Sequence, residues 1–119
     1  MQRFTDLLVW KRSHASTLAI YRATAHFPAE ERYGLTSQLR RAALSIPANI
    51  AEGSKRVSRQ DYARFLNMAE GSLAETEYLL MVSRDLGYLP ANEVETLLGE
   101  LTEIARMLNA LRTRVARVK

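Results

Sequence analysis

The sequence predicts an all-α protein, an up-down-up-down antiparallel four-helix bundle that forms a single domain over residues 1–119. Only five Gly and three Pro interrupt the chain, and nearly all lie at the ends of apolar segments, which favours long helices. Four segments repeat apolar residues at spacings of three and four, and none alternates with the period of two that is typical of strands. The chain has no Cys, so its core depends on packing without disulfides or thiolate metal sites.

The first predicted helix covers residues 6–27. Thr5 is a suitable N-cap, and Asp6 lies in the first turn, where the helix dipole stabilises a carboxylate. Pro28 ends the segment. The apolar stripe of this helix consists of Leu7, Trp10, His14, Leu18 and Tyr21.

The second predicted helix covers residues 35–52 and contains a proline. Pro47 has no N–H to donate and clashes with the carbonyl four residues earlier, so we expect a kink there. Gly53 suits the left-handed position just past the helix end. The apolar positions are Leu35, Leu39, Ala42, Ala43, Ile46 and Ile50.

The third predicted helix covers residues 59–86, between a cap formed by Ser58 with Asp61 and a stop at Gly87. Gly71 lies mid-helix, and close approach of another helix would explain it. The stripe consists of Tyr62, Leu66, Ala69, Leu73, Thr76, Leu80 and Ser83, widened by Phe65, Leu79 and Leu86.

The fourth predicted helix opens at Pro90 and keeps strict three-four apolar spacing to Val118. Because the connections are short, neighbouring helices should be antiparallel. The N-terminus, the loop after residue 53 and the C-terminus then share one end. That end gathers Arg3, Lys55, Arg56, Arg59, Arg112, Arg114, Arg117 and Lys119, whereas Glu30, Glu31, Asp85, Glu93 and Glu95 lie at the other.

Several motifs resemble a known family. They are Val9-Trp10-Lys11, Tyr33-Gly34-Leu35, Gln38-Leu39-Arg40-Arg41-Ala42, Ser45-Ile46-Pro47-Ala48-Asn49-Ile50-Ala51-Glu52-Gly53, Phe65-Leu66 and Ala69-Glu70-Gly71-Ser72-Leu73. The chain resembles the bacterial four-helix-bundle family whose genes were first noticed inside intervening sequences of 23S ribosomal RNA. That resemblance implies a homopentamer, in which five bundles form a barrel. The fold is also similar to the accessory protein of diversity-generating retroelements, a pentamer that binds nucleic acid and a reverse transcriptase.

The cations of the shared end are the candidate nucleic-acid-binding residues. They are Lys55, Arg56, Arg59, Arg112, Arg114 and Arg117. Lys and Arg contacts to phosphates dominate nucleic-acid affinity and need no base reading. The alternative is that these cations provide solubility and compensate helix dipoles.

Arg40 and Arg41 lie in the middle of the second predicted helix, so at least one should face a neighbouring element. One interpretation is an ion pair with Glu70, Glu75 or Glu77 across a helix or subunit contact. The other is phosphate contact on the outside of the barrel.

Pro47, Asn49, Glu52 and Gly53 are candidate structural or interface residues rather than catalytic ones. Glu52 lies near a helix C-terminus, where its charge opposes the dipole. We therefore expect a compensating cation, from Arg56, from Arg59 or from a neighbouring subunit.

No enzyme signature is complete. A carboxylate-bridged metal bundle needs Glu three residues before His, and neither His14 nor His26 has one. The helical ribonucleases need a longer spacing than the three residues between Arg22 and His26. A Gly-rich phosphate loop is also missing. We expect no catalytic residues, no metal and no cofactor, and we expect His14 to be a core or interface residue.

Two functional hypotheses follow. The leading one is a non-enzymatic homopentamer that binds RNA or another nucleic acid through its basic end. The alternative is a ring-shaped scaffold that recruits a protein partner, such as a reverse transcriptase, without nucleic acid. The chain lacks a signal-peptide pattern and any apolar run near the ~20 residues that span a bilayer, so we expect a cytoplasmic protein away from membranes.

Overall fold

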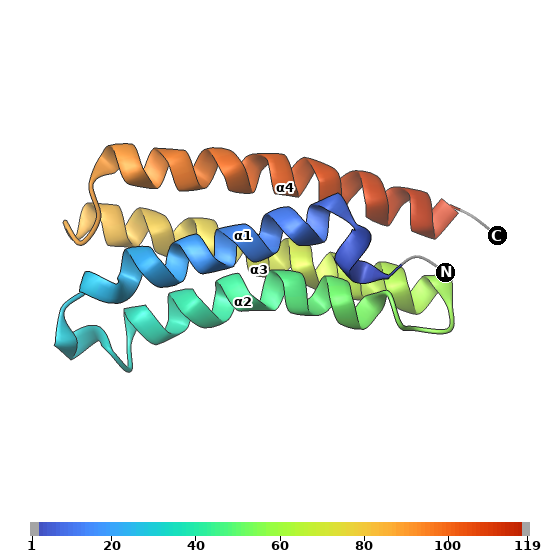
Figure 1. Cartoon of the computed structure of the whole chain (residues 1–119), viewed down its shortest axis with the longest axis horizontal. Coiled ribbons are helices and arrows are strands. Elements are labelled where there is room, and N and C mark those ends of the chain that lie inside the picture. The colour runs from blue at the N-terminus through green and yellow to red at the C-terminus, as the bar shows by residue number, and fades with distance from the viewer. Residues whose placement is uncertain (1–2, 118–119) are drawn as a thin grey trace.

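A computed structural model describes residues 3–117, which form four long helices. They are α1 (Leu8–Ala23), α2 (Leu35–Gly53), α3 (Arg59–Asp85) and α4 (Ala91–Arg117), with short 3₁₀ turns at Phe4–Asp6, Thr24–His26 and Ala29–Glu31. Each long helix runs opposite to the one before it, in a rod of 48 × 25 × 20 Å (Figure 1). The predicted contributions of Val118 and Lys119 lie outside the described residues.

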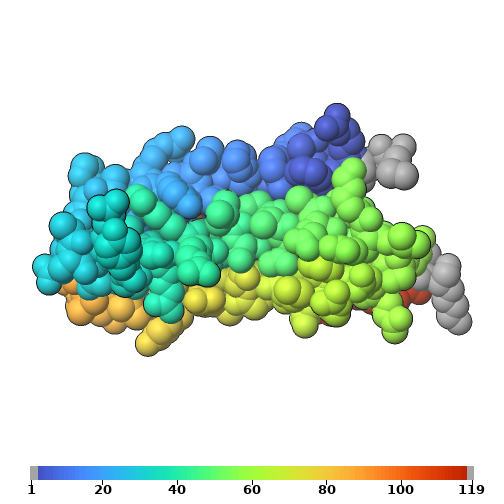
Figure 2. Space-filling view, turned by 90° about the horizontal axis from the view of Figure 1, so that it is seen from below, coloured from blue at the N-terminus to red at the C-terminus, as the bar shows by residue number. Residues whose placement is uncertain are grey.

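The helices pack around one core. α1 contacts α2 and α4, and α3 contacts α2 and α4. Seen from the α2 side, α2 lies between α1 and α3 (Figure 2). Every predicted apolar position of α2 is buried, and so is most of the α3 and α4 stripes, although Leu86 is exposed at the end of α3.

The stripe predicted for α1 is not its core face. The buried residues of α1 are Val9, Ser13, Ser16, Thr17 and Ile20. Small hydroxyl side chains can be buried here because they bond within the bundle, as when Thr17 Oγ1 donates to the Ser13 carbonyl at 2.9 Å. Most of the predicted stripe therefore faces outward, with His14, Leu18 and Tyr21 exposed, whereas Leu7 and Trp10 are half-buried against the core.

The start of α1 also differs from the prediction. Thr5 does not cap α1, because Phe4–Asp6 forms a 3₁₀ turn and α1 begins only at Leu8. The Phe4 ring packs edge-on against Trp10, with ring centroids 5.2 Å apart. Aromatic packing thus positions this end of the chain where we expected a capping hydroxyl.

α2 continues through Pro47 without ending. Proline leaves the carbonyl four residues earlier, that of Ala43, without its helix donor. Thr17 Oγ1 of α1 donates to this carbonyl at 3.1 Å in the buried core. A side chain on the neighbouring helix thus replaces the missing bond, whereas the kink itself stays a prediction.

The backbone conformation and the surroundings differ among three glycines of the helices and their ends. Gly87 has φ +80° and ends α3 as predicted, and Tyr88 N–H donates back to the Ser83 carbonyl. Gly53 does not adopt the predicted left-handed conformation. A Cβ there would lie 2.7 Å from Phe65 Cβ, so Gly53 allows α2 and α3 to approach closely. The close approach expected at Gly71 is absent within residues 3–117, since a Cβ there would meet nothing within 4 Å.

Candidate nucleic-acid interface

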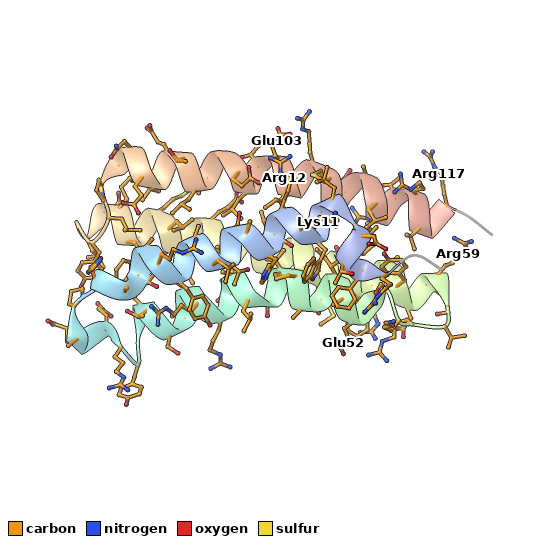
Figure 3. The ribbon with its side chains drawn as sticks, in the orientation of Figure 1. Lys11, Arg12, Glu52, Arg59, Glu103 and Arg117 are labelled. Carbon is orange, nitrogen blue, oxygen red and sulfur yellow. The ribbon has the colours of Figure 1, made fainter. Side chains whose placement is uncertain are left out.

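One end of the bundle brings together the N-terminal segment, the α2–α3 loop and the last turns of α4 (Figure 1). Arg59 and Arg117 project from this end (Figure 3). We call the exposed cations found here the basic end: Arg3, Lys55, Arg59, Arg114 and Arg117. None of the five forms an ion pair within residues 3–117. The predicted member Lys119 lies outside the described residues.

Two predicted nucleic-acid-binding residues have partners inside the molecule. Arg56 Nη2 donates to Glu52 Oε2 at 2.9 Å, and its guanidinium lies 4.6 Å from the centroid of the Phe65 ring. Arg56 is therefore the cation that compensates Glu52 near the end of α2. Arg112 pairs with Glu70 across the α3–α4 contact, where both side chains are largely buried. Arg56 and Arg112 thus have partners within the bundle, and we leave them out of the basic end.

The charge of Arg114 in α4 acts on Tyr62 in the first turn of α3. Burial raises the pKa of the Tyr62 hydroxyl, and the positive charge of Arg114 opposes that rise. Arg114 and Arg117 also line a shallow groove of about 400 Å³ with Asn109 and Thr113. The last turns of α4 therefore offer cations and neutral hydrogen-bonding groups on one open surface.

Arg59 occupies a position that helix electrostatics disfavours. It is the first residue of α3, after the Ser58 cap whose Oγ accepts from Asp61 N–H at 3.0 Å. A cation at this end meets the positive pole of the helix dipole. Dipole compensation accounts for Arg114 and Arg117 near the end of α4, but it does not account for Arg59.

Arg40 and Arg41, the two central arginines of α2, have different surroundings. Arg40 does not pair with a glutamate within residues 3–117. Instead it donates to Thr24 Oγ1 at 2.8 Å and to the Tyr21 carbonyl at 3.0 Å, and it covers the Tyr21 ring. Two acceptors near the end of α1 lie within hydrogen-bond distance of Arg40, so Arg40 joins α1 to α2. Arg41 is exposed and lines a groove with Glu75.

The remaining predicted structural residues also have assigned surroundings. Asn49 Nδ2 donates to the Ser45 carbonyl at 2.8 Å, which adds a hydrogen bond to α2 just after Pro47. Its contact is therefore with its own helix, as a structural residue would have. Pro47 is buried, four residues after the Ala43 carbonyl that accepts from Thr17.

Two polar contacts between distant segments were not predicted from the sequence. Arg12 of α1 makes a two-point contact with Glu100 of α4, at 2.8 Å from Nε and 2.7 Å from Nη2. At the opposite end, Tyr88 donates its hydroxyl to Glu31 at 2.8 Å, and Glu31 also accepts from the Leu35 N–H. Each pair joins segments far apart in sequence, and no local spacing signals such a contact.

Within residues 3–117, no three His, Cys, Asp or Glu side chains are grouped so that they could hold a metal ion. His14 stacks on Trp10 with ring centroids 5.0 Å apart. Each helix in the same residues is too short or too polar to cross a bilayer.

These features define a class of protein, a small all-α bundle of four helices whose cations gather at one end. The chain belongs to the family described as 23S rRNA-intervening sequence protein, whose model matches residues 5–110. Its fold is similar to a crystal structure of a protein of unknown function from the S23 ribosomal protein family of Bacteroides thetaiotaomicron. That match has a TM-score of 0.79 and 27% sequence identity, and it covers 88% of this chain and 98% of the other. Among curated proteins, none matches the chain.

The comparisons confirm the family resemblance and the all-helical fold. The family has no established function. The function of this chain must therefore be argued from its own surfaces.

Proposed function

We propose that this protein is a non-enzymatic homopentamer that acts in the cytoplasm and binds RNA through its basic end. The outward apolar stripe of α1 supports the assembly, and the unpaired cations of three converging segments support the binding. The two parts of the proposal have separate tests.

The support for assembly is a partly exposed apolar surface on α1 and α2. We call this surface the outer stripe: Trp10, His14, Leu18 and Tyr21 of α1 with Leu44 of α2. Leu18 is 41% exposed and Leu44 is 49% exposed. Thr17 of α1 donates a hydrogen bond to the carbonyl of Ala43 in α2. Leu18 and Leu44 are the next residues on the two helices, so both lie on the outer side of the α1–α2 contact. Exposed apolar side chains on two neighbouring helices are a feature of interaction sites.

A second copy of this chain is the partner that we propose for the outer stripe. α3 carries its own exposed apolar groups, Met68 and Tyr78, on either side of Gly71, where a Cβ would meet open space. Residues 8–53 carry six basic and three acidic residues, whereas residues 60–105 carry two basic and nine acidic. Two different surfaces with opposite charge favour head-to-tail contacts, and such contacts form a ring when the rotation between subunits closes.

Light scattering tests the assembly. We expect the wild-type protein to have the mass of five chains and the Leu18→Ser variant to have a smaller mass. Leu8→Ser is the matched control, because Leu8 lies on the same helix, is 59% exposed and lies outside the outer stripe. A wild-type monomer or dimer would refute the pentamer, and equal effects of the two variants would refute the assignment of the outer stripe.

The support for RNA binding comes from cations of the basic end that neither compensate a helix dipole nor form an ion pair in residues 3–117. Arg59 opposes its own helix dipole, and Lys55 and Arg59 lie in one exposed segment without an ion-pair partner in residues 3–117. Phosphates would relieve this repulsion and release counterions. Base preference should be weak, because phosphate contacts carry no direct sequence information.

RNA binding is tested with the double variant Lys55→Ser/Arg59→Ser. Both side chains are exposed, so the fold should be retained while RNA affinity falls. Arg22→Ser/Arg32→Ser is the matched control, with the same charge change outside the basic end. Absence of wild-type binding even at low salt would overturn the RNA proposal.

A second candidate function is a ring that recruits a protein, such as a reverse transcriptase, without nucleic acid. The observation that favours it is Val57, which is fully exposed in the α2–α3 loop between the cations. An apolar side chain there suits a protein surface better than a phosphate backbone. Failure of RNA binding together with an intact pentamer would favour this function.

A further inference from the structure

A polar groove of about 420 Å³ lies between α2 and α3, away from the basic end. Its lining includes small residues just before and along α2: Gly34, Ser37, Ala42 and Ser45. These short side chains leave a hollow beside α3. Figure 2 views the molecule from the side on which α2 and α3 meet. The volume lies within the range of small-molecule sites.

The walls of the groove carry charged and polar groups that are not engaged elsewhere. They are Gln38 and Arg41 of α2 and Glu75 of α3. Within residues 3–117, none of these three side chains makes a hydrogen bond or ion pair of its own. Arg41 and Glu75 have opposite charges and line one hollow, yet they lie beyond the 4.0 Å of an ion pair. The groove therefore presents a cation and an acceptor to a ligand rather than to each other.

Tyr33 forms one rim of the groove and is 87% exposed. The guanidinium of Arg32 lies 5.3 Å from the centroid of its ring, on one face. The high exposure shows that the rest of the ring is open. An exposed aromatic face next to a polar hollow suits a planar base, since stacking contributes about 1–3 kcal/mol per base.

We propose that this groove binds a guanine nucleotide. Tyr33 stacks on the base, Arg41 contacts the phosphate, and Glu75 accepts the N–H groups of the base edge. An ionised carboxylate is an acceptor only. Among the RNA bases, guanine presents two adjacent donors on its Watson–Crick edge, whereas adenine presents an acceptor beside its donor. Glu75 therefore selects guanine over adenine.

The test measures binding of guanosine 5′-monophosphate and adenosine 5′-monophosphate to the full chain by calorimetry. We expect the guanine nucleotide to bind more tightly, by about tenfold for one well-placed pair of hydrogen bonds. Tyr33→Ser should weaken binding by about tenfold or more. Glu75→Gln should remove the preference for guanine, because its amide donates as well as accepts.

Leu86→Ser is the matched control for the loss of an exposed large side chain, since Leu86 is 55% exposed and lies outside the groove. It should leave nucleotide binding unchanged. Lys55→Ser/Arg59→Ser should also leave it unchanged, so failure of the basic end and failure of the groove are distinguishable. Binding that is lost only with the basic-end variant would place the nucleotide there and overturn the groove site.

Three further results would overturn the inference. They are no binding at millimolar guanine nucleotide, equal affinity for the two nucleotides, and equal effects of Tyr33→Ser and Leu86→Ser. A changed scattering mass in Arg41→Ser, without any nucleotide binding, would instead assign the groove to a contact between copies of the chain.

Discussion

At the scale of single residues, the Thr17 hydroxyl replaces a helix hydrogen bond that Pro47 removes from α2. The Ala43 carbonyl has lost its helix donor to Pro47, and Thr17 supplies a donor from α1. The same hydroxyl also lies 2.9 Å from the Ser13 carbonyl of its own helix. Because it has one hydrogen to donate, the two acceptors share it.

This arrangement makes Thr17 and Pro47 energetically coupled. Thr17→Val should lower the free energy of unfolding by about 1–3 kcal/mol, because a buried carbonyl loses its donor. The loss should be smaller in a Pro47→Ala background, where the alanine N–H can serve Ala43. Urea unfolding of the two single variants and the double variant measures the coupling. Additive effects would show that the Thr17 bond to Ala43 contributes nothing.

The same Pro47→Ala variant tests the expected kink. If the bend positions Asn49 and Glu52 against a neighbouring subunit, restoring the helix bond should weaken the assembly. Light scattering across a dilution series measures the mass of the assembly and so detects this weakening. A more stable protein with an unchanged mass would show that the proline is incidental to assembly.

At the scale of helices, the fold is held by apolar stripes and by a few polar links between neighbours. The α1–α4 contact contains the Arg12–Glu100 pair. The hydrogen bond from Arg12 lowers the pKa of Glu100, and the charge of Arg12 adds to it against the effect of burial. Because the folded pKa is below the unfolded one, this stabilisation is present above the unfolded pKa and disappears as pH falls through the folded pKa.

Removing the arginine should therefore change acid unfolding. Arg12→Gln should move the midpoint of acid unfolding to higher pH, measured by circular dichroism. Arg106→Gln is the matched control, because Arg106 pairs with Glu103 on its own helix and is highly exposed. An equal shift in both variants would mean that the Arg12–Glu100 pair has no special effect.

The unexplained glycine of α3 gives a second prediction at this scale. Gly71→Ala should favour the helix by about 0.5–1 kcal/mol, and so should Gly99→Ala in α4, because a Cβ at either position meets nothing within 4 Å. If a second copy approaches α3 closely, Gly71→Ala should also lower the scattering mass, whereas Gly99→Ala should not. Identical behaviour of the two variants would remove Gly71 from the proposed interface.

At the scale of the whole molecule, periodicity predicted the helices because burial of α2, α3 and α4 follows their apolar spacing. It failed for α1 because Ser13, Ser16 and Thr17 are small enough to bury, while Leu18 and Tyr21 face outward. Alternating directions correctly placed Arg59 and Arg117 at one end (Figure 3). The partners of Arg40 and Arg112 depend on three-dimensional neighbours that one sequence does not reveal.

Assembly and RNA binding should be coupled if both proposals hold. Cyclic contacts between parallel bundles place every basic end on one rim of the ring. One RNA strand can then contact phosphate-binding groups of several subunits. The logarithm of affinity should fall linearly with the logarithm of salt, with a slope of about −0.7 for each single-stranded phosphate contacted. The wild-type slope should therefore exceed what the cations of one basic end can supply.

The assembly-deficient Leu18→Ser variant tests this coupling, because its basic end is intact. We expect a flatter salt slope and weaker RNA binding than in the Leu8→Ser control, although both proteins carry the same charges. Lys55→Ser/Arg59→Ser should flatten the slope while keeping the pentameric mass, which separates loss of charge from loss of assembly. If Leu18→Ser dissociates the ring and the slope stays that of the wild type, each subunit binds RNA alone. The ring would then have a purpose other than gathering the basic ends.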